Sequence, residues 1–365
     1  MSRRLPPATL GLIGGGQLGQ MIGLSAIAIG YRVVVLDPSP NCPAAAIADA
    51  QLVAAYDDAH ALAELNALCD IITYEFENAD PHAIASTLST EKLPQGVKAL
   101  SVAQHRLREK ALAEACGIPT PTYTAITTPD ELMALTSFPV IVKTCRFGYD
   151  GKGQWLIQNK DDLRKLSLPF PAEYIAETKI DFTQEIAVTV ARFVDGTTAF
   201  DPIATVHEKG ILRSAISPAT LNESLRDKAL AYTQSLAHAL DYIGVLCVEY
   251  FVQDDTLYFN EIAPRPHNSA HATIEGYSLS QYDLHLLAIT GSPCVPTRCL
   301  QSTYLENILG QDEPMWRTKA LAVPQAHIHL YGKHDIRPGR KLGHVVLAAA
   351  TKDALTSLIE SWRNA

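Results

Sequence analysis

The chain has 365 residues, of which 47% are hydrophobic and 19% charged, so it is long enough for two or three packed domains. Its formal net charge of −9 argues against the basic field that a nucleic-acid backbone or an anionic bilayer requires. No signal peptide and no run of about 18 apolar residues is visible. We therefore expect a cytoplasmic protein whose partners are small molecules, with no nucleic acid and no membrane.

Residues 1–120 predict a doubly wound α/β domain. Short apolar runs at 10–13, 31–36 and 70–75 alternate with longer amphipathic segments that begin at Gln17 and span 59–68. This alternation is typical of a parallel sheet with helical crossovers. Pro119 and Pro121 then force extended backbone, so we place a domain boundary at residue 120.

Residues 121–296 predict a second, α+β domain dominated by antiparallel strands. Strand-like runs lie at 138–144, 154–157, 173–177, 185–194, 244–252 and 256–263, and helices near 129–136, 161–166 and 222–240. Residues 297–365 predict a small β-rich domain, with strands at 326–333 and 344–350 and a closing helix near 355–362. The expected fold class is thus α/β followed by α+β.

A GxGxxG pattern follows the first predicted strand. Gly14, Gly16 and Gly19 fit it, and Asp37 ends the next strand where a dinucleotide-binding fold places its ribose-binding acid. Glycines at a helix start expose N–H groups that favour a phosphate. The pattern does not specify which phosphate, so an NAD-dependent oxidoreductase stays open at this point.

A second glycine-rich segment, RFGYDGKGQ, lies between two predicted strands at 146–154. Gly148, Gly151 and Gly153 allow close approach of the backbone to phosphates, and Lys143 and Lys152 supply charge. A plain surface hairpin is the competing interpretation of this loop.

Glu249 and Glu261 interrupt two apolar strand-like runs, and Asn260 precedes the second of them. Carboxylates on neighbouring strands are the hard oxygen ligands that suit Mg²⁺ on nucleotide phosphates, whereas a solvated acidic face is the alternative. The next loop contains His267, Asn268 and His271. We interpret it as a substrate-contacting loop and weigh a transition-metal site against it.

A cationic cluster stands near the end of the acidic chain, in LYGKHDIRPGRKLGHV. Its members are Lys333, Arg337, Arg340 and Lys341. Arginine and lysine around turn residues suit a phosphorylated small molecule, and solvated turn charges are the competing account.

Seven segments follow one another along the chain: GLIGGGQLGQM, TYEFEN, GYDGKGQ, ETKIDFTQEIAV, HEKGIL, NEIAPRPHNS, and YGK with RPGRKLGHV. In this order they resemble the 5-(carboxyamino)imidazole ribonucleotide synthetase family over essentially the whole chain. The resemblance implies a three-part ATP-grasp architecture: a biotin-carboxylase-like N-terminal domain, an ATP-grasp domain and a small C-terminal β-rich domain. It also implies a carbon–nitrogen ligase of purine biosynthesis that carboxylates 5-aminoimidazole ribonucleotide with bicarbonate and MgATP through carboxyphosphate, with Mn²⁺ as a substitute metal.

The resemblance also implies site residues. The residues expected at the ATP phosphates are Arg108, Lys143, Gly148, Tyr149, Asp150, Gly151, Lys152, Gly153 and Gln154. Those expected at the adenine are Glu177, Thr178, Lys179 and Ile180, and Glu185 is expected at the ribose. His207, Asn260 and Glu261 are expected near the nucleotide, and the magnesium ligands are Glu249 and Glu261. For the second substrate they are Gln17, Leu18, Glu75, Tyr149, Asp150, Lys152, His267, Asn268, Lys333 and Arg340.

Two of these residues are the predicted catalytic groups. Asp150 is the expected base or orienting carboxylate for the attacking amine, and Lys333 the expected counter-charge. The sequence departs from the family pattern at Ala270, where glycine is usual, and at Lys152, where some relatives have arginine, which affects fine geometry only.

The resemblance also implies a homodimer. Three alternative functions remain beside the predicted one. The alternatives are a related ligase such as formate-dependent glycinamide ribonucleotide transformylase, a regulatory protein with an inactive nucleotide site, and the NAD-dependent oxidoreductase. Lys143, Glu249, Asn260 and Glu261 together argue against an inactive site, because a decayed site is free to lose its metal ligands.

Overall fold

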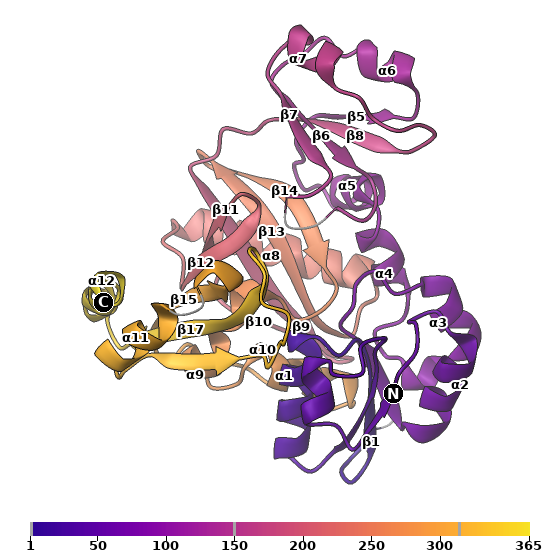
Figure 1. The fold of residues 1–365 in the computed structure, drawn as a ribbon, viewed down its shortest axis with the longest axis vertical. Helices are drawn as coiled ribbons and strands as arrows, with labels where there is room; N and C mark the ends of the chain where they lie inside the picture. The colour runs from indigo at the N-terminus through magenta and orange to yellow at the C-terminus, as the bar shows by residue number, and fades with distance from the viewer. Residues whose placement is uncertain (1–2, 149–150, 313–314) are drawn as a thin grey trace.

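The N-terminal part of the chain forms a parallel sheet flanked by helices. The computed structural model describes residues 3–148, 151–312 and 315–365, and Figure 1 shows its fold. The strand order is β3-β2-β1-β4. The strands are β1 (Thr9–Ile13), β2 (Arg32–Leu36), β3 (Ala50–Leu52) and β4 (Ile71–Tyr74). The helices are α1 (Gln17–Ala28), α2 (Ala59–Leu68), α3 (Pro81–Thr87) and α4 (Lys98–Ala103), with short 3₁₀ helices at Pro43–Ala46 and Thr90–Lys92.

The order of these strands reverses at β1, which pairs in parallel with β2 on one side and β4 on the other. Ligands of open parallel sheets bind at such a point, outside the carboxyl ends of the strands. Ile13 and Tyr74 are paired at those ends, so the glycine turn after β1 and Glu75 after β4 lie next to each other. The fold thereby brings together two segments that are about 60 residues apart.

A small antiparallel sheet follows, in the order β5-β8-β6-β7. It stands apart from the rest of the molecule at the top of Figure 1, with α6 and α7 beside it. Helix α5 (Arg106–Ala115) leads into it. Its elements are β5 (Tyr123–Ile126), α6 (Pro129–Met133), β6 (Val140–Thr144), β7 (Gln154–Ile157), α7 (Lys160–Lys165) and β8 (Tyr174–Thr178).

The large sheet has nine strands in the order β14-β13-β9-β11-β12-β15-β17-β16, with β10 beside β9. It crosses the predicted boundary at residue 296, because β12 pairs with β15. Residues 297–365 therefore extend this sheet instead of forming one of their own, and the division at 120 and 296 stays a prediction. The strands are β9 (Gln184–Arg192), β10 (Thr197–Ala199), β11 (Ile203–Glu208), β12 (Ile211–Ser217), β13 (Gly244–Gln253), β14 (Thr256–Ala263), β15 (Ser302–Leu309), β16 (His327–Leu330) and β17 (Lys341–Ala349).

Helices pack on this sheet and join it to the N-terminal domain. They are α8 (Glu223–Ala239), α9 (Thr273–Gly276), α10 (Gln281–Ile289), α11 (Met315–Ala322) and α12 (Lys352–Asn364), with 3₁₀ turns at Asn268–Ala270 and Gly310–Asp312. One apolar cluster includes Leu36 and Ile72 of the parallel sheet and Leu246 and Phe259 of the large one. In the part of the chain described, no helix combines the length and apolarity needed to cross a membrane.

A buried histidine at this junction makes stability depend on pH. His285 on α10 is 0% exposed; its Nδ1 accepts the Val245 N–H at 3.0 Å, and its Nε2 lies 2.8 Å from Thr73 Oγ1. The ring is therefore neutral, and burial lowers its pKa to about 3. Because the unfolded chain has a histidine pKa near 6.5, this contribution to stability is present above about pH 6.5 and lost as the pH falls towards 3.

We expect the His285→Gln variant to have a flatter dependence of unfolding free energy on pH. Between pH 6 and 4 one histidine contributes a slope of about 1.4 kcal/mol per pH unit, which the variant lacks. Urea unfolding at each pH measures it. His60→Gln, at an exposed position of α2, is the matched control. Parallel curves for His285→Gln and the parent chain would contradict the assignment.

Candidate active site

A cavity of about 700 Å³ is lined by residues of the parallel domain, the small sheet and the large sheet. Seven cationic side chains and four carboxylates line it, in a chain whose net charge is −9. The local excess of positive charge suits ligands that carry phosphate. The cations are Arg106, Lys152, Arg265, Lys333, Arg337, Arg340 and Lys341, and the carboxylates are Glu75, Glu77, Glu109 and Glu261.

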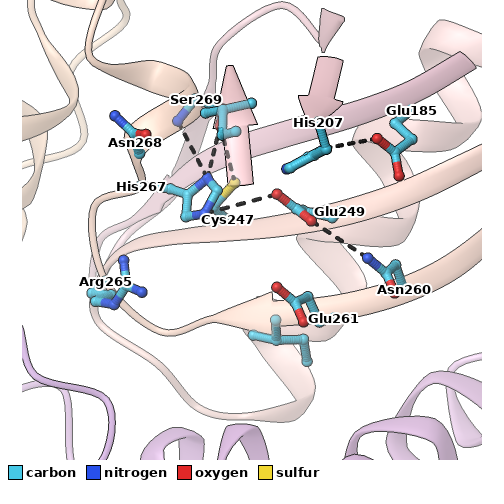
Figure 2. A network of polar contacts seen from close by, with 12 residues as sticks. Glu185, His207, Cys247, Glu249, Asn260, Glu261, Arg265, His267, Asn268 and Ser269 are labelled. Atoms are coloured by element: carbon cyan, nitrogen blue, oxygen red, sulfur yellow. Dashed lines mark hydrogen bonds and ion pairs between the residues drawn. The ribbon is translucent and has the colours of Figure 1, made fainter. Parts of the chain in front are cut away.

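Two carboxylates stand side by side on the large sheet, as the sequence predicted. Glu249 on β13 pairs in register with Glu261 on β14, and a bulge follows directly. Figure 2 shows both side chains facing the same space, with Asn260 beside them. Asn260 donates to Glu249 through its amide, at 3.4 Å between Nδ2 and Oε2. The interpretation as a solvated acidic face fails for Glu249, whose side chain is only 13% exposed.

The two carboxylates have opposite electrostatic character. Burial, and then the negative charge of Glu261, raise the pKa of Glu249 to about 7. Burial also acts to raise the pKa of Glu261, but the charges of Arg106 and Lys143 outweigh it, so that pKa is lowered. A cation between the two would offset the repulsion that Glu249 experiences.

These residues fit Mg²⁺ held jointly by protein and ligand. Within 3–148, 151–312 and 315–365 no group of three or more histidine, cysteine, aspartate or glutamate side chains is arranged to hold a metal ion. Magnesium bound to a nucleotide is usually held by one or two carboxylates, and phosphate oxygens and water fill its remaining coordination positions. His267 and His271 have separate partners, Ser269 Oγ and Tyr282 OH, and do not converge on a common point.

The structure places Arg106, and not Arg108, at this site. Arg106 lines the cavity, with Nη1 at 3.3 Å from Glu261 Oε2. Arg108 is exposed and donates to the carbonyl oxygen of Ser101. Two residues along a helix are separated by about 200° around its axis, so one of the two arginines must point away. The assignment of Arg108 to the phosphates is therefore corrected to Arg106.

One buried glutamate pairs with two buried lysines. Glu177 at the end of β8 lies 2.6 Å from Lys143 Nζ and 3.2 Å from Lys110 Nζ. Burial acts to raise the pKa of Glu177, but these two charges lower it to about 2. Its side chain is thus a counter-ion to both lysines, and Lys143, which does not line the cavity, points to it. The adenine contact of Glu177 stays a prediction. Thr178, Lys179 and Ile180 follow at the more exposed end of the strand and do not line the cavity.

Glu185 and His207 contact each other beside Glu249 (Figure 2). His207 Nδ1 lies 2.7 Å from Glu185 Oε2. Burial acts to lower the pKa of His207, but the bond to Glu185 and the charge of Glu249 raise it overall. The surrounding carboxylates therefore favour the protonated form of His207.

The glycine loop closes one wall of the cavity through Gly148 and Lys152. Gly151 and Gly153 have φ of +77° and +70°, which only glycine adopts readily. A side chain on Gly151 would meet the Lys209 carbonyl oxygen at 2.7 Å, so the loop lies directly on the turn between β11 and β12. Gln154 begins β7 with its side chain exposed, and Tyr149 and Asp150 lie outside the described residues.

The residues predicted to bind the second substrate also line the cavity. Lys333 Nζ donates to Gln17 Oε1 at 2.7 Å, and Gly16 donates its N–H to Glu75 Oε1 at 2.6 Å. Burial raises the pKa of Glu75 to about 7, although the Gly16 N–H and Arg265 partly oppose it. All the predicted members that the structure describes line the cavity: Gln17, Leu18, Glu75, Lys152, His267, Asn268, Lys333 and Arg340.

The first glycine turn has no free place for a dinucleotide. Asp37 Oδ2 accepts the Gly15 N–H at 2.8 Å and the Tyr56 hydroxyl at 2.8 Å, so it is not available to a ribose. Glu75 accepts a hydrogen bond from the N–H of Gly16 at the start of α1. The NAD interpretation is therefore wrong, and the glycines serve close packing: a side chain on Gly19 would meet the Gly14 carbonyl oxygen at 2.5 Å.

Several lining residues were not assigned from sequence. Arg106 and Glu109 line the cavity, and they share one face of α5 with Lys110, which does not, at the i, i+3, i+4 spacing that could have identified them. Glu109 accepts the Ile262 N–H at 2.8 Å. Arg265 also lines the cavity and binds Glu77 at 2.6 Å.

Comparisons with known proteins agree with this arrangement. Family models match in succession the ribonucleotide synthetase preATP-grasp domain (residues 7–104), the ATP-grasp domain (111–282) and the phosphoribosylaminoimidazole carboxylase C-terminal domain (303–357). The N5-carboxyaminoimidazole ribonucleotide synthases of Bacillus subtilis and Brucella melitensis are 36% and 39% identical, over 100% and 93% of this chain and 98% and 96% of theirs.

Solved structures agree over the same length. The Staphylococcus aureus N5-carboxyaminoimidazole synthetase complexed with ADP superposes with a TM-score of 0.92 at 34% identity, covering 99% of each chain. The Aspergillus clavatus N5-carboxyaminoimidazole synthase in complex with ADP and 5-aminoimidazole ribonucleotide gives 0.87 at 30% identity, over 98% of this chain and 99% of that one. On this evidence the chain belongs to the N5-carboxyaminoimidazole ribonucleotide synthase family of ATP-grasp ligases.

Proposed function

We propose that this chain carboxylates 5-aminoimidazole ribonucleotide with bicarbonate at the expense of ATP, giving N5-carboxyaminoimidazole ribonucleotide, ADP and phosphate in purine biosynthesis. The observation that carries the proposal is the pair of carboxylates, Glu249 and Glu261, of which Glu261 lines a cavity together with seven cationic side chains. We assign the triphosphate and its metal to the carboxylate pair, which we call the nucleotide end. We assign the ribonucleotide monophosphate to the cations around Lys333 and Arg340, which we call the ribonucleotide end. Relatives of the same fold bind ADP, or ADP with the aminoimidazole ribonucleotide.

At the nucleotide end we assign charge neutralisation to Arg106, Lys143 and Lys152. Arg106 and Lys152 line the cavity, while Lys143 lies behind it with Glu177. Glu249 and Glu261, with Asn260, are the proposed holders of Mg²⁺, and Mn²⁺ suits the same hard oxygen ligands. When bound, the metal would neutralise charge on the β- and γ-phosphates. Glu185 is the proposed ribose ligand, with His207 beside it.

Bicarbonate must be activated, because its carbon is a poor electrophile. A bicarbonate oxygen attacks the γ-phosphorus, the bond to the ADP oxygen breaks, and carboxyphosphate forms. The fixed cations of the cavity stabilise the charge that spreads over the transferring oxygens. Carboxyphosphate is lost quickly to water, so the loop that carries Gly148 and Lys152 has to cover it.

The exocyclic amine of the ribonucleotide then attacks the carboxyl carbon, and phosphate leaves. The amine must lose a proton in this step, and Asp150 is our proposed base or orienting group. Lys333, held by Gln17, is the proposed counter-charge. The monophosphate is assigned to the cationic loop that includes Arg340, and the ring to the surface formed by Gln17, Leu18, His267 and Asn268.

We further propose that the protein acts as a homodimer in the cytoplasm, with small molecules as its other ligands. The dimer rests on the family resemblance alone. The cytoplasm is supported by the reaction itself, because its substrates are phosphorylated metabolites and ATP.

The reaction predicts ADP release that depends on 5-aminoimidazole ribonucleotide. With ATP, Mg²⁺ and bicarbonate present, ADP should form slowly until the ribonucleotide is added, and one ADP should then appear per ribonucleotide carboxylated. A coupled assay of ADP with and without the ribonucleotide measures this. Stimulation by formate with glycinamide ribonucleotide, and none by the aminoimidazole ribonucleotide, would overturn the proposal.

The two arginines of α5 provide a matched test of the nucleotide end. Arg106→Gln should lower kcat/KM for ATP by about 10- to 100-fold, the loss expected for a charge-assisted hydrogen bond. Arg108→Gln should change it by about 2-fold or less, because that side chain is exposed. Steady-state kinetics at saturating ribonucleotide gives both values. Equal losses, or the larger loss for Arg108→Gln, would contradict the corrected assignment.

The carboxylate pair predicts a specific change in magnesium dependence. Glu249→Gln and Glu261→Gln keep the side-chain shape, yet each should raise the Mg²⁺ concentration for half-maximal rate and lower kcat by about 100-fold. Glu306→Gln is the control, since Glu306 is also mostly buried but pairs with Arg213 outside the cavity. An unchanged magnesium requirement in both variants would rule out the proposed ligands.

A further inference from the structure

Stacked histidines lie buried behind the ribonucleotide end of the cavity. The ring of His344 lies 4.7 Å from that of His271 and 4.5 Å from that of His329 between centroids. His271 and His344 are 0% exposed, and the Nδ1 of each faces a buried tyrosine hydroxyl, that of Tyr282 for His271 and that of Tyr331, at 2.8 Å, for His344. We call these five residues the histidine joint; none of the five lines the cavity.

The joint is built from segments of different parts of the chain. Tyr282 lies on α10, Tyr331 directly after β16, and His344 on β17. Tyr282 and Tyr331 also pack in one apolar cluster with Leu12 and Ile22 of the parallel domain. The joint therefore brings together α10, the segment after β16, β17 and the parallel domain.

Hydrogen bonds fix the protonation of the first histidine. Gln281 accepts the His267 N–H through Oε1 and donates to the His267 carbonyl through Nε2, both at 2.8 Å, which sets the orientation of its amide. The same Nε2 lies 3.5 Å from His271 Nδ1, so this nitrogen accepts and the Tyr282 hydroxyl donates to it. His271 is thus neutral, in keeping with the burial that lowers its pKa and that of His344.

The joint reaches the cavity at two points. Through Gln281 it holds both backbone groups of His267, whose Nε2 lies 3.8 Å from Glu249 Oε1 at the nucleotide end. Through Tyr331 it carries Lys333, two residues further on, whose Nζ lies 5.3 Å from the tyrosine ring centroid. The cluster therefore connects the position of His267 to that of Lys333, and its third histidine, His329, pairs with Glu275 at 2.6 Å.

We propose that the histidine joint consists of positioning residues that couple the consumption of ATP to carboxylation of the ribonucleotide. The inference rests on the proposed function and names a role for residues that touch neither substrate. Carboxyphosphate formed at one end of the cavity must meet the amine held at the other before water reaches it. A joint that lets the Lys333 loop shift relative to His267 would leave phosphoryl transfer intact and allow the activated carboxyl group to hydrolyse.

The test removes one hydroxyl at a time and keeps every ring. Tyr331→Phe and Tyr282→Phe each delete one bond of the joint. Tyr250→Phe is the matched control: Tyr250 is also 0% exposed, and its hydroxyl bonds Thr233 Oγ1 of α8 at 2.9 Å. ADP and carboxylated ribonucleotide are measured in the same reaction, with the KM for each substrate and the melting temperature.

We expect both joint variants to release more ADP than product, by about 2-fold or more, and to raise the KM for the ribonucleotide by about 5-fold while that for ATP stays within about 2-fold. Tyr250→Phe should lose similar thermal stability and keep ADP and product equal. If Tyr331 acts through His344, the double variant Tyr331→Phe/His344→Phe should raise that KM no further than His344→Phe alone.

Equal ADP and product in both joint variants, or the same imbalance in Tyr250→Phe, would overturn the inference. Should a tyrosine variant fail to fold, His329→Gln at the partly exposed end of the stack, where its side chain is 29% exposed, carries the same test. The unmutated chain distinguishes failure of this inference from failure of the proposed function. If it shows no ribonucleotide-dependent ADP release, the proposed function is overturned instead.

Discussion

The register between β13 and β14 is the constraint on which the site depends. A slip of one residue would turn Glu261 to the opposite face of the sheet and separate it from Glu249. Helix α5 holds this register from outside: Lys110 Nζ donates to the carbonyl oxygens of Phe259 and Asn260 at 3.0 Å, and Glu109 accepts the Ile262 N–H at 2.8 Å. The strand is therefore fixed on both sides of Glu261 by side chains of one helical turn.

The same lysine extends this constraint to the small sheet. Lys110 shares Glu177 with Lys143, so the strand that carries Asn260 and Glu261 is tied electrostatically to β8 and β6. An isolated charge in such a place would be costly to bury, whereas the carboxylate of Glu177 pairs with both lysines and leaves one net positive charge. That charge lies next to the cavity where phosphates are expected, which explains why the chain keeps an ionic cluster and not an apolar one at this junction.

The sequence predicted much of this, and its failures have physical causes. Alternation of apolar residues located β13 and β14 and so the adjacency of Glu249 and Glu261, because strand pairing follows from a short connection. It could not choose between Arg106 and Arg108, since both suit a phosphate and only the rotation of α5 distinguishes them. Helix α10 was not predicted because seven of its nine residues are buried, which leaves no polar face to give a helical period.

The GxGxxG pattern misled for a similar reason. Here the glycines allow close packing of the backbone. Their N–H groups donate to Asp37 and Glu75, which follow β2 and β4, and the GxGxxG pattern alone does not predict these contacts. The pairing of β12 with β15 was hidden likewise, because a sheet that continues across a proline-rich connection has no local signature. The features that the sequence did not predict therefore depend on contacts between segments that are distant along the chain.

The distribution of charge between the cavity and its surroundings follows from the same contacts. Loops that meet phosphates carry their cations into the cavity, where ligands of opposite charge offset them. Behind those loops, His271 and His344 face tyrosine hydroxyls, and His329 pairs with Glu275 at 2.6 Å. A buried charge at such a junction needs a partner of this kind, because an unpaired one would be costly. Paired charges and directed hydrogen bonds outside the cavity therefore support the charged groups inside it.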